Sequence, residues 1–591
     1  MSTSTTPTRS LGLHERYAVS RRCVNSPSSV SAAAILQLDL ASASRQGDID
    51  RAFDALRCRL ETRIDQAFAQ YPLLGYCIQS PRAKAPRWSS ITPTPTFRQI
   101  LHTGAPVTKQ AGAQGANKLL SQAILDDHIS LPKSTNLEKG PLWKVTLSRI
   151  ESEPACLVVL STDHVINDGR GTLNLFRFLL QSQEPEATAA PIDPIPPASD
   201  KIFNFRPSIG YLLHEAFKEL LLPHLPLPKK AKLKLQGPTS WPASPSPTTT
   251  STEYDIVRTP KLCQPTLDIL LITAPHLINN LKSLARTHVD PSNPAARAAT
   301  LHSILHTLSL VALYAAVAVS HEANLDDFAL VLGTATPISL REEVRPSKRR
   351  RGFPLSPSVE VAPVPLPFTS GNFVSSYADT YTLHPTTRFW AFTNDFATTL
   401  ASPRGKSLAR QHMGLLGFIP DFERSTNRKR KLDEEEEVDS SLGGRDEAYA
   451  NGWEKLFGER AASRTPFDSA MTVSNLGLLD VESLGGDGWR VREATWAQSH
   501  TPQGEAFGLD VVGFVTGEEQ TLSIGLSCRP SAFRDEELRK RFRGYLERLV
   551  RAFAVEPVHG KLSQETNDGE ARLDLTQEIN FAGLTRFLTS S

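Results

Sequence analysis

The stretch that decides the fold reads His164-Val165-Ile166-Asn167-Asp168-Gly169. Among the 15 histidines of the 591-residue chain, only His164 is followed four positions later by an aspartate, with a glycine directly after it. With aspartate and glycine each near one residue in twenty, chance gives about 0.04 such matches in a chain of this size. The pattern therefore favours a functional interpretation of this segment.

The segment lies between a predicted strand and a predicted helix. Residues 155–162 are mostly apolar and favour a buried strand, and residues 172–180 favour a helix. His164 is therefore expected on a loop at a sheet edge, where a rigid scaffold often presents catalytic groups. An imidazole accepts a proton near neutral pH, so His164 is a candidate general base, and Gly169 permits a sharp backbone path.

Two other interpretations of His164 stay open at this level. A single histidine at a strand end is more often structural than catalytic. A metal site is the other alternative, but the sequence shows no third and fourth ligand at suitable spacing, so no metal is expected.

Composition sets the class of protein. Hydrophobic residues make up 40% and charged residues 22%, as in a soluble globular protein. Lys and Arg number 65 against 63 Asp and Glu, a formal net charge of +2, which is too balanced for a dedicated nucleic-acid binder. The length exceeds one ordinary core, so two domains are expected.

Cysteines and apolar runs predict an intracellular, cytoplasmic protein. The N-terminus has no apolar run typical of a secretory signal, and the run Leu308–Val319 is too short to span a bilayer and favours a buried helix. The cysteines are scattered, which predicts reduced thiols and neither a zinc site nor a disulfide framework. They are Cys23, Cys58, Cys77, Cys156, Cys263 and Cys528.

Periodicity and composition divide the chain into two parts. Residues 1–225 form the predicted first domain, 226–253 a linker rich in Pro, Ser and Thr, and 254–591 the second domain. Insertions near 345–365 and 423–444 carry clustered charges and are expected to be disordered. Further predicted strands cover 32–40, 141–150 and 329–335, and predicted helices cover 48–70 and 300–320.

One further segment has two interpretations. Residues 209–222 are strongly apolar at helical spacing and are followed by Lys229, Lys230, Lys232 and Lys234. A helix packed on the body of the protein is the favoured reading. The alternative is a helix on an anionic membrane surface, which would make the protein peripheral on the endoplasmic reticulum or a lipid droplet.

The whole pattern resembles a known superfamily. His164 to Gly169 resembles the HxxxDG motif of the condensation-domain and chloramphenicol-acetyltransferase-like acyltransferases. Segments in the expected order are similar to those of the fungal alcohol acetyltransferase family within it. They are Leu11-Gly-Leu-His-Glu-Arg-Tyr17, Tyr71-Pro-Leu-Leu-Gly75, Thr336-Pro-Ile-Ser-Leu-Arg341, Gly371-Asn372 and Val473-Ser-Asn-Leu-Gly477.

The resemblance implies a fold and a set of roles. It implies an α/β (α+β) protein with two chloramphenicol-acetyltransferase-like open-sheet domains and a tunnel between them. His164 would be the general base, and Asp168 would be structural and paired with Arg341. Ser474 would be an oxyanion donor, with an ordinary turn as the equal alternative for it and for Asn475. By the same resemblance Asn475 and Asn372 would contact substrate.

The implied activity is transfer of an acetyl or other acyl group from coenzyme A to a hydroxyl, as in ester biosynthesis. Acetyl-CoA or another acyl-CoA would be the co-substrate, with no bound cofactor, and the acceptor a small alcohol or hydroxylated metabolite. We expect a monomer without a nucleic-acid partner. The alternatives are a non-catalytic binding protein of the same fold and a carrier-dependent condensation or acyl-transfer enzyme of secondary metabolism. No carrier domain is recognised in the sequence.

Overall fold

The computed structural model describes twelve segments of the chain and five single positions. These are residues 8–39, 46–110, 114–183, 195–227, 266–289, 298–341, 370–420, 449–462, 469–499, 504–528, 536–554 and 578–590, with 112, 241, 467, 532 and 533. The predicted insertions at 345–365 and 423–444 and most of the predicted linker at 226–253 lie outside the described residues.

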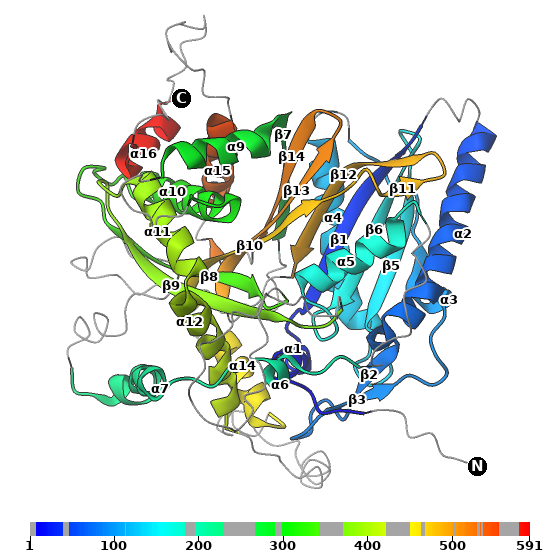
Figure 1. Cartoon of the computed structure of the whole chain (residues 1–591), viewed down its shortest axis with the longest axis horizontal. Coiled ribbons are helices and arrows are strands. Elements are labelled where there is room, and N and C mark those ends of the chain that lie inside the picture. The colour runs from blue at the N-terminus through cyan, green and yellow to red at the C-terminus, as the bar shows by residue number, and fades with distance from the viewer. Residues whose placement is uncertain are drawn as a thin grey trace, which may run out of the picture.

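Two open six-stranded sheets organise the molecule, which confirms the predicted α/β fold with two open-sheet units (Figure 1). The first sheet contains, in spatial order, β11 (Gly485–Gly486), β12 (Trp489–Gln498), β1 (Ser29–Leu38), β6 (Ala155–Asp163), β5 (Trp143–Ile150) and β4 (Leu101–Thr103). The second contains β7 (Thr266–Pro275), β14 (Glu519–Cys528), β13 (Glu505–Thr516), β10 (Ser469–Leu479), β8 (Leu330–Ser339) and β9 (Val374–Leu383). A small hairpin joins β2 (Tyr76–Gln79) to β3 (Arg87–Ser90).

Helices surround both sheets. Those in the first part of the chain are α1 (Leu13–Cys23), α2 (Gln46–Gln70), α3 (Phe97–Ile100), α4 (Gly115–Ser134), α5 (Gly169–Leu180), α6 (Ser199–Ile202) and α7 (Ile209–Ala216). Those in the second part are α9 (Leu277–Thr287), α10 (Leu301–Ser320), α11 (Phe389–Ala401), α12 (Pro403–Gly414), α14 (Gly452–Ala462), α15 (Glu536–Ala554) and α16 (Phe581–Thr589). We call the first sheet with α2, α4 and α5 the first lobe, and the second sheet with α9, α10, α15 and α16 the second lobe.

The central strand β1 is buried on both faces, which explains its unbroken apolar sequence. Ala32, Ala34 and Leu36 belong to the core that includes α2 and α5. Ala33 and Ile35 point the other way and pack with residues of α4 and with Ile269 of the second lobe. Helix α4 therefore lies between the two sheets and joins the lobes through apolar contacts.

The first sheet is not built from the first part of the chain alone. Strand β12 returns from the second part and pairs antiparallel with β1, from Val30 opposite Gln498 to Leu38 opposite Trp489. Its Trp489 and Trp496 enter the first lobe's core. Since β13 of the second sheet is the next strand after β12 in the chain, the chain crosses between the lobes after β12.

The second lobe is centred on α10, whose residues are nearly all buried. Within the described residues this is the single helix long and apolar enough to cross a membrane, and 89% of its apolar window is buried inside the protein. Burial against α9, α15 and α16 agrees with the predicted core helix over 300–320.

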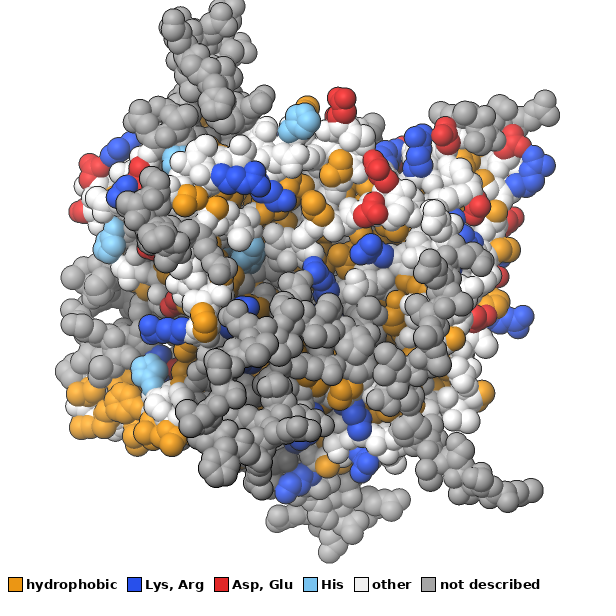
Figure 2. All heavy atoms as spheres, in the orientation of Figure 1, with side chains coloured by type: hydrophobic (Ala, Val, Ile, Leu, Met, Phe, Trp, Pro, Cys, Tyr) orange, Lys and Arg blue, Asp and Glu red, His pale blue; other side chains and the backbone are white. Residues whose placement is uncertain are grey.

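Two sequence-based expectations need correction. The helix after His164 begins at Gly169 and not at 172, because the Asp168 side chain caps it by accepting a hydrogen bond from the Gly171 N–H. Packing of residues 209–222 on the body of the protein is the other expectation, but of the described side chains in this range only Leu222 is buried. None of the α7 residues is buried, and the helix projects away from both lobes (Figure 1). Figure 2 shows hydrophobic side chains gathered at the lower left corner, where Figure 1 places α7.

Candidate functional site

His164 lies where β6 ends and before α5 begins. Its N–H donates to the Ser28 carbonyl at 2.7 Å, which ties it to the start of β1. Preceding Asp163 is fully buried, forms an ion pair with Arg22 and accepts from the Val165 N–H at 3.0 Å. The loop backbone is thus held at both ends by the first lobe.

Asp168 accepts hydrogen bonds from several donors, and among the described residues it makes no hydrogen bond or ion pair with His164. Its carboxylate accepts from Arg341 Nη1 at 2.9 and 2.7 Å, from the Gly171 N–H at 2.8 Å and from the Phe373 N–H at 2.8 Å. Burial alone would raise its pKa, but the charge of Arg341 and these hydrogen bonds outweigh burial and lower it. Asp168 therefore stays ionised and joins the two lobes. The pairing expected between Asp168 and Arg341 is present.

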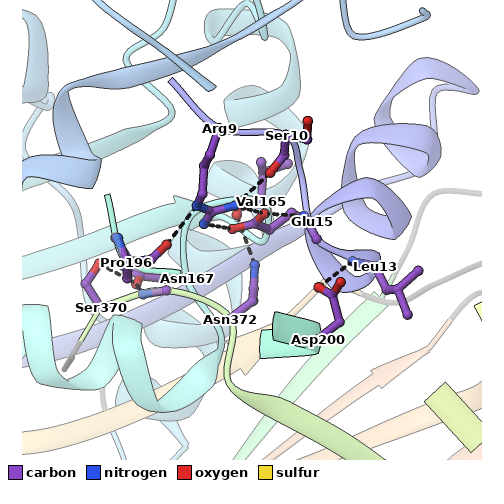
Figure 3. Close-up of polar contacts among 12 residues, drawn as sticks. Arg9, Ser10, Leu13, Glu15, Val165, Asn167, Pro196, Asp200, Ser370 and Asn372 are labelled. Atoms are coloured by element: carbon purple, nitrogen blue, oxygen red, sulfur yellow. Dashed lines mark hydrogen bonds and ion pairs between the residues drawn. The ribbon is translucent and has the colours of Figure 1, made fainter. Parts of the chain in front are cut away.

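Residues 370–373 of the second lobe lie against this loop, and we call them the strap (Figure 3). The Asn167 Oδ1 accepts from the Gly371 N–H at 2.8 Å and from Ser370 Oγ at 3.1 Å. Arg341 Nη2 donates to the Gly371 carbonyl at 2.9 Å. Gly371 has a φ of 105°, a conformation that favours glycine, so this position needs the residue that the sequence has.

The strap residue Asn372 sets the orientation of the His164 ring. Asn372 Nδ2 donates to the His164 carbonyl at 2.6 Å and to the Val165 carbonyl at 2.9 Å, the latter visible in Figure 3. Its Oδ1 then faces His164 Nδ1 at 3.2 Å and can only accept, so Nδ1 carries the proton. Nε2 is therefore the nitrogen with a free lone pair.

Burial keeps His164 in the neutral form. It lowers the pKa of His164 below its ordinary 6.5, and the charge of Arg21 lowers it further, against opposing effects of Asp168 and Asp163. The His14 ring of α1 lies edge-on to His164 with centroids 6.3 Å apart. Burial lowers the pKa of His14 to about 3, with a further contribution from His164.

Ser474 and Asn475 lie on β10 and have no part in the hydrogen bonds described above. Ser474 is buried opposite Asp510 of β13, and within the described residues it makes no hydrogen bond with His164. The Asn475 Oδ1 accepts from the Gly477 N–H at 2.8 Å, which is a local turn. The roles of Ser474 and Asn475 toward substrate stay predictions.

The end of β10 contacts the start of α5. Arg170 Nη1 donates to the Leu476 carbonyl at 3.0 Å. A Cβ at Gly169 would lie 2.9 Å from Trp496 Cζ3 and 3.3 Å from Leu476 Cδ2. Gly169 is therefore required by close packing and not by its backbone angles.

A cavity of about 340 Å³ lies at the junction of the lobes. It is lined by the residues between α1 and β1, by α4, and by ends of β7 and β14, including Arg22, Ser26, His128, Lys133, Thr266 and Ser499. Arg22 connects this wall to the loop that carries His164 through its ion pair with Asp163. Within the described residues, no group of three His, Cys, Asp or Glu side chains could hold a metal ion.

Sequence reasoning missed three contributors to the site. His14, Arg22 and Asp163 were not singled out, although His14 lies in the Leu11–Tyr17 segment and Asp163 directly precedes His164. The position of Asp163 was a usable signal, since a carboxylate at the end of an apolar strand needs a partner. Nothing local marks Arg22 or His14, because their partners are far along the chain.

No family model matches the chain, and no curated protein matches it. The solved structures that resemble it over nearly its whole length include condensation domains and a polyketide synthase associated protein.

Three such structures illustrate the resemblance. The first condensation domain of the CDA synthetase has 11% identity and a TM-score of 0.47, covering 94% of this chain and 98% of that one. A mutant starter condensation domain of rhizomide synthetase RzmA, in complex with C8-CoA and Leu-SNAC, has 13% identity and a TM-score of 0.44, with coverages of 93% and 94%. Polyketide synthase associated protein 5 from Mycobacterium tuberculosis has 11% identity and a TM-score of 0.43, with coverages of 92% and 99%.

Proposed function

We propose that the protein is an acyl-CoA-dependent O-acyltransferase of the alcohol O-acetyltransferase type, with His164 as its general base. The single observation that carries the proposal is the arrangement of Asn372, whose amide holds the His164 ring with Nδ1 protonated and Nε2 available. Together with the lowered pKa, this makes His164 a proton acceptor at neutral pH.

In the proposed reaction, Nε2 of His164 is the base. His164 Nε2 removes the proton of the acceptor hydroxyl as its oxygen attacks the thioester carbonyl carbon. The tetrahedral intermediate collapses, the carbon–sulfur bond breaks, and the departing thiolate takes the proton from the imidazolium to give free CoA and an ester. Ser474 is the proposed donor to the transient oxyanion.

Asp168 and Arg341 take no proton in this scheme. They hold the His164 loop against the strap, so that the His164 ring stays within hydrogen-bonding distance of the Asn372 amide. Because both groups are buried and mutually paired, neither is available as a second acid or base.

The cavity at the lobe junction is the proposed entry for the thioester arm. Its volume is within the range typical of small-molecule sites, and its lining mixes hydroxyl groups with apolar side chains. Lys133 is exposed at this wall and suits a phosphate-bearing donor such as coenzyme A. Acetyl is the favoured acyl group and an alcohol the favoured acceptor, on the sequence resemblance.

The test is CoA release. The purified chain is mixed with acetyl-CoA and a panel of alcohols, and free thiol is measured. We expect acceptor-dependent release, and a loss of about 100-fold or more in His164→Ala, since a general base typically contributes that much. His384→Ala, the same change at an exposed histidine, is the matched control and should leave the rate unchanged.

The outcomes separate the alternatives. CoA release equal to the blank with every acceptor, or equal rates for His164→Ala and the unaltered chain, contradicts the proposal. Binding of acetyl-CoA without turnover identifies the non-catalytic alternative. Turnover only with thioesters of a carrier protein identifies the carrier-dependent enzyme.

A further inference from the structure

A second histidine lies beside the proposed base. The His14 ring of α1 is edge-on to the His164 ring, with centroids 6.3 Å apart, and both residues are half-buried. In the proposed reaction His164 takes the proton of the acceptor hydroxyl. The oxygen of that hydroxyl has two lone pairs, and one of them must be directed at the thioester carbon. His14 lies where a side chain can influence that oxygen.

The position of the His14 ring is fixed by the contacts of its two neighbours in the sequence. Glu15 pairs with Arg9 at 2.6 Å (Figure 3). The Leu13 N–H donates to Asp200 Oδ1 at 3.3 Å, also drawn in Figure 3. These contacts hold the start of α1 in place, so the His14 ring keeps its position next to the proposed base.

The His14 ring is neutral and has a hydrogen-bonding capacity that the described residues do not satisfy. Burial lowers its pKa to about 3, so at pH 7 one ring nitrogen carries a proton and the other a lone pair. Nδ1 is buried and has no hydrogen-bond partner among the described residues. Because a buried N–H without an acceptor is costly, the ring proton belongs on Nε2. His14 therefore offers an N–H donor without adding a positive charge beside His164.

We propose that His14 is a second catalytic residue, whose Nε2–H donates to the oxygen of the acceptor hydroxyl while the proton of that hydroxyl goes to His164. The inference rests on the proposed acyl transfer. A hydroxyl oxygen that bonds both rings makes two contacts of about 2.8 Å, which fits between rings whose centroids are 6.3 Å apart. His14 takes no proton in this step.

This arrangement selects a hydroxyl over an amine as acceptor. A hydroxyl oxygen can accept from His14 with one lone pair and attack the thioester with the other. A neutral amine has a single lone pair, which it needs for the attack, so the His14 N–H opposes its reaction. His14 thus favours formation of an ester over formation of an amide.

The test compares His14→Leu with the unaltered chain in steady-state acyl transfer from acetyl-CoA. The acceptor is the alcohol of the panel that gives the fastest CoA release, with the amine of the same carbon skeleton in parallel. We expect kcat/KM for the alcohol to fall about tenfold, the usual effect of one lost hydrogen bond. The KM for acetyl-CoA should be unchanged, and the amine should react no more slowly than with the unaltered chain.

Two further variants separate a contact with substrate from a structural role. His14→Gln keeps an N–H donor at this position and should retain most of the alcohol activity. Val19→Ala removes packing of the same helix, since Val19 is fully buried in the first lobe's core. It should lower the urea midpoint of unfolding and leave kcat/KM for the alcohol unchanged.

The outcomes distinguish failure of this inference from failure of acyl transfer. CoA release equal to the blank with every acceptor overturns both. Release that requires His164 but is equally fast in His14→Leu leaves acyl transfer standing and overturns the role of His14. An equal loss with alcohol and amine, or an equal loss in Val19→Ala, assigns His14 to the packing of α1 and also overturns the proposal.

Discussion

Asn372 lies where the lobes touch, and the two ends of its amide do different things. The nitrogen donates to two carbonyls of the His164 loop, and the oxygen faces the imidazole. An amide turned the other way would place its oxygen against carbonyl oxygens, so the loop backbone determines the amide orientation, and the amide determines the tautomer of His164. These three hydrogen bonds of Asn372 thus decide which ring nitrogen is basic.

This arrangement predicts the pH dependence of kcat/KM. Because burial lowers the pKa of His164 below 6.5, the neutral base persists below that pH, and the acidic limb should have its midpoint below 6.5. Asn372→Ala removes the acceptor of Nδ1–H, a hydrogen bond that favours the charged ring. We expect the midpoint to move downward by about one pH unit.

The measurement is a pH–rate profile of acyl transfer for both proteins, with unfolding midpoints recorded in parallel. A midpoint that stays in place while the rate falls uniformly would mean that Asn372 supports the loop without influencing the titration of His164.

At the scale of elements, the start of α5 packs against Trp496 of β12 and Leu476 of β10, which belong to different lobes. Gly169 faces the Trp496 ring, and that ring is buried and fixed by its Nε1 donating to the Val511 carbonyl at 2.9 Å. The tryptophan cannot easily move aside for an added methyl group. Helix α5 therefore tolerates only glycine at its first position, although the backbone conformation there is ordinary.

We predict opposite effects for the same substitution in two helices. Gly169→Ala should lower the free energy of unfolding by about 1–3 kcal/mol, the typical cost of overpacking. Gly544→Ala, in exposed open space within α15, should raise it by about 0.5–1 kcal/mol, because alanine loses less backbone freedom on folding. Urea unfolding measures both. A higher free energy of unfolding for Gly169→Ala than for the unaltered chain would show that the Trp496 ring moves aside.

At the scale of the whole molecule, the first lobe depends on the second part of the chain. Strand β12 covers β1 by nine paired positions, and Trp489, Val491 and Trp496 fill the core beneath it. Without β12, the edge of β1 and the apolar side chains beside it would face water. An open apolar sheet edge is a recognised aggregation site.

We therefore predict that residues 1–225 expressed alone are insoluble or lack fixed tertiary structure. Co-expression with 254–591 should restore a soluble complex, since β12 is then supplied in trans. Solubility and near-ultraviolet circular dichroism provide the measurement. A soluble 1–225 fragment with native-like near-ultraviolet signals would contradict the dependence on β12.

Much of the architecture was readable in advance because it is local. Apolar runs located β1, β5 and β6, and helical spacing of apolar residues located α2 and α10, to within a few residues. The motif from His164 to Gly169 identified the loop, and the resemblance placed Arg341 opposite Asp168, where the structure has it. These features depend on residue spacing and on short segments, which a sequence displays directly.

Other features exist only in three dimensions. The sequence by itself determined the candidate base, and its resemblance to the acyltransferase superfamily implied the carboxylate that anchors the loop and the two-sheet fold. Only the tertiary structure decided that Asn372 orients His164, that His14 lies beside it, that β12 completes the first sheet and that the 209–221 helix faces outward. The physical reason is that each of these four features depends on which segment, distant in the sequence, packs against the residue or helix concerned. Apolar periodicity shows that one face of a helix or strand must be buried, but it does not show which segment buries it.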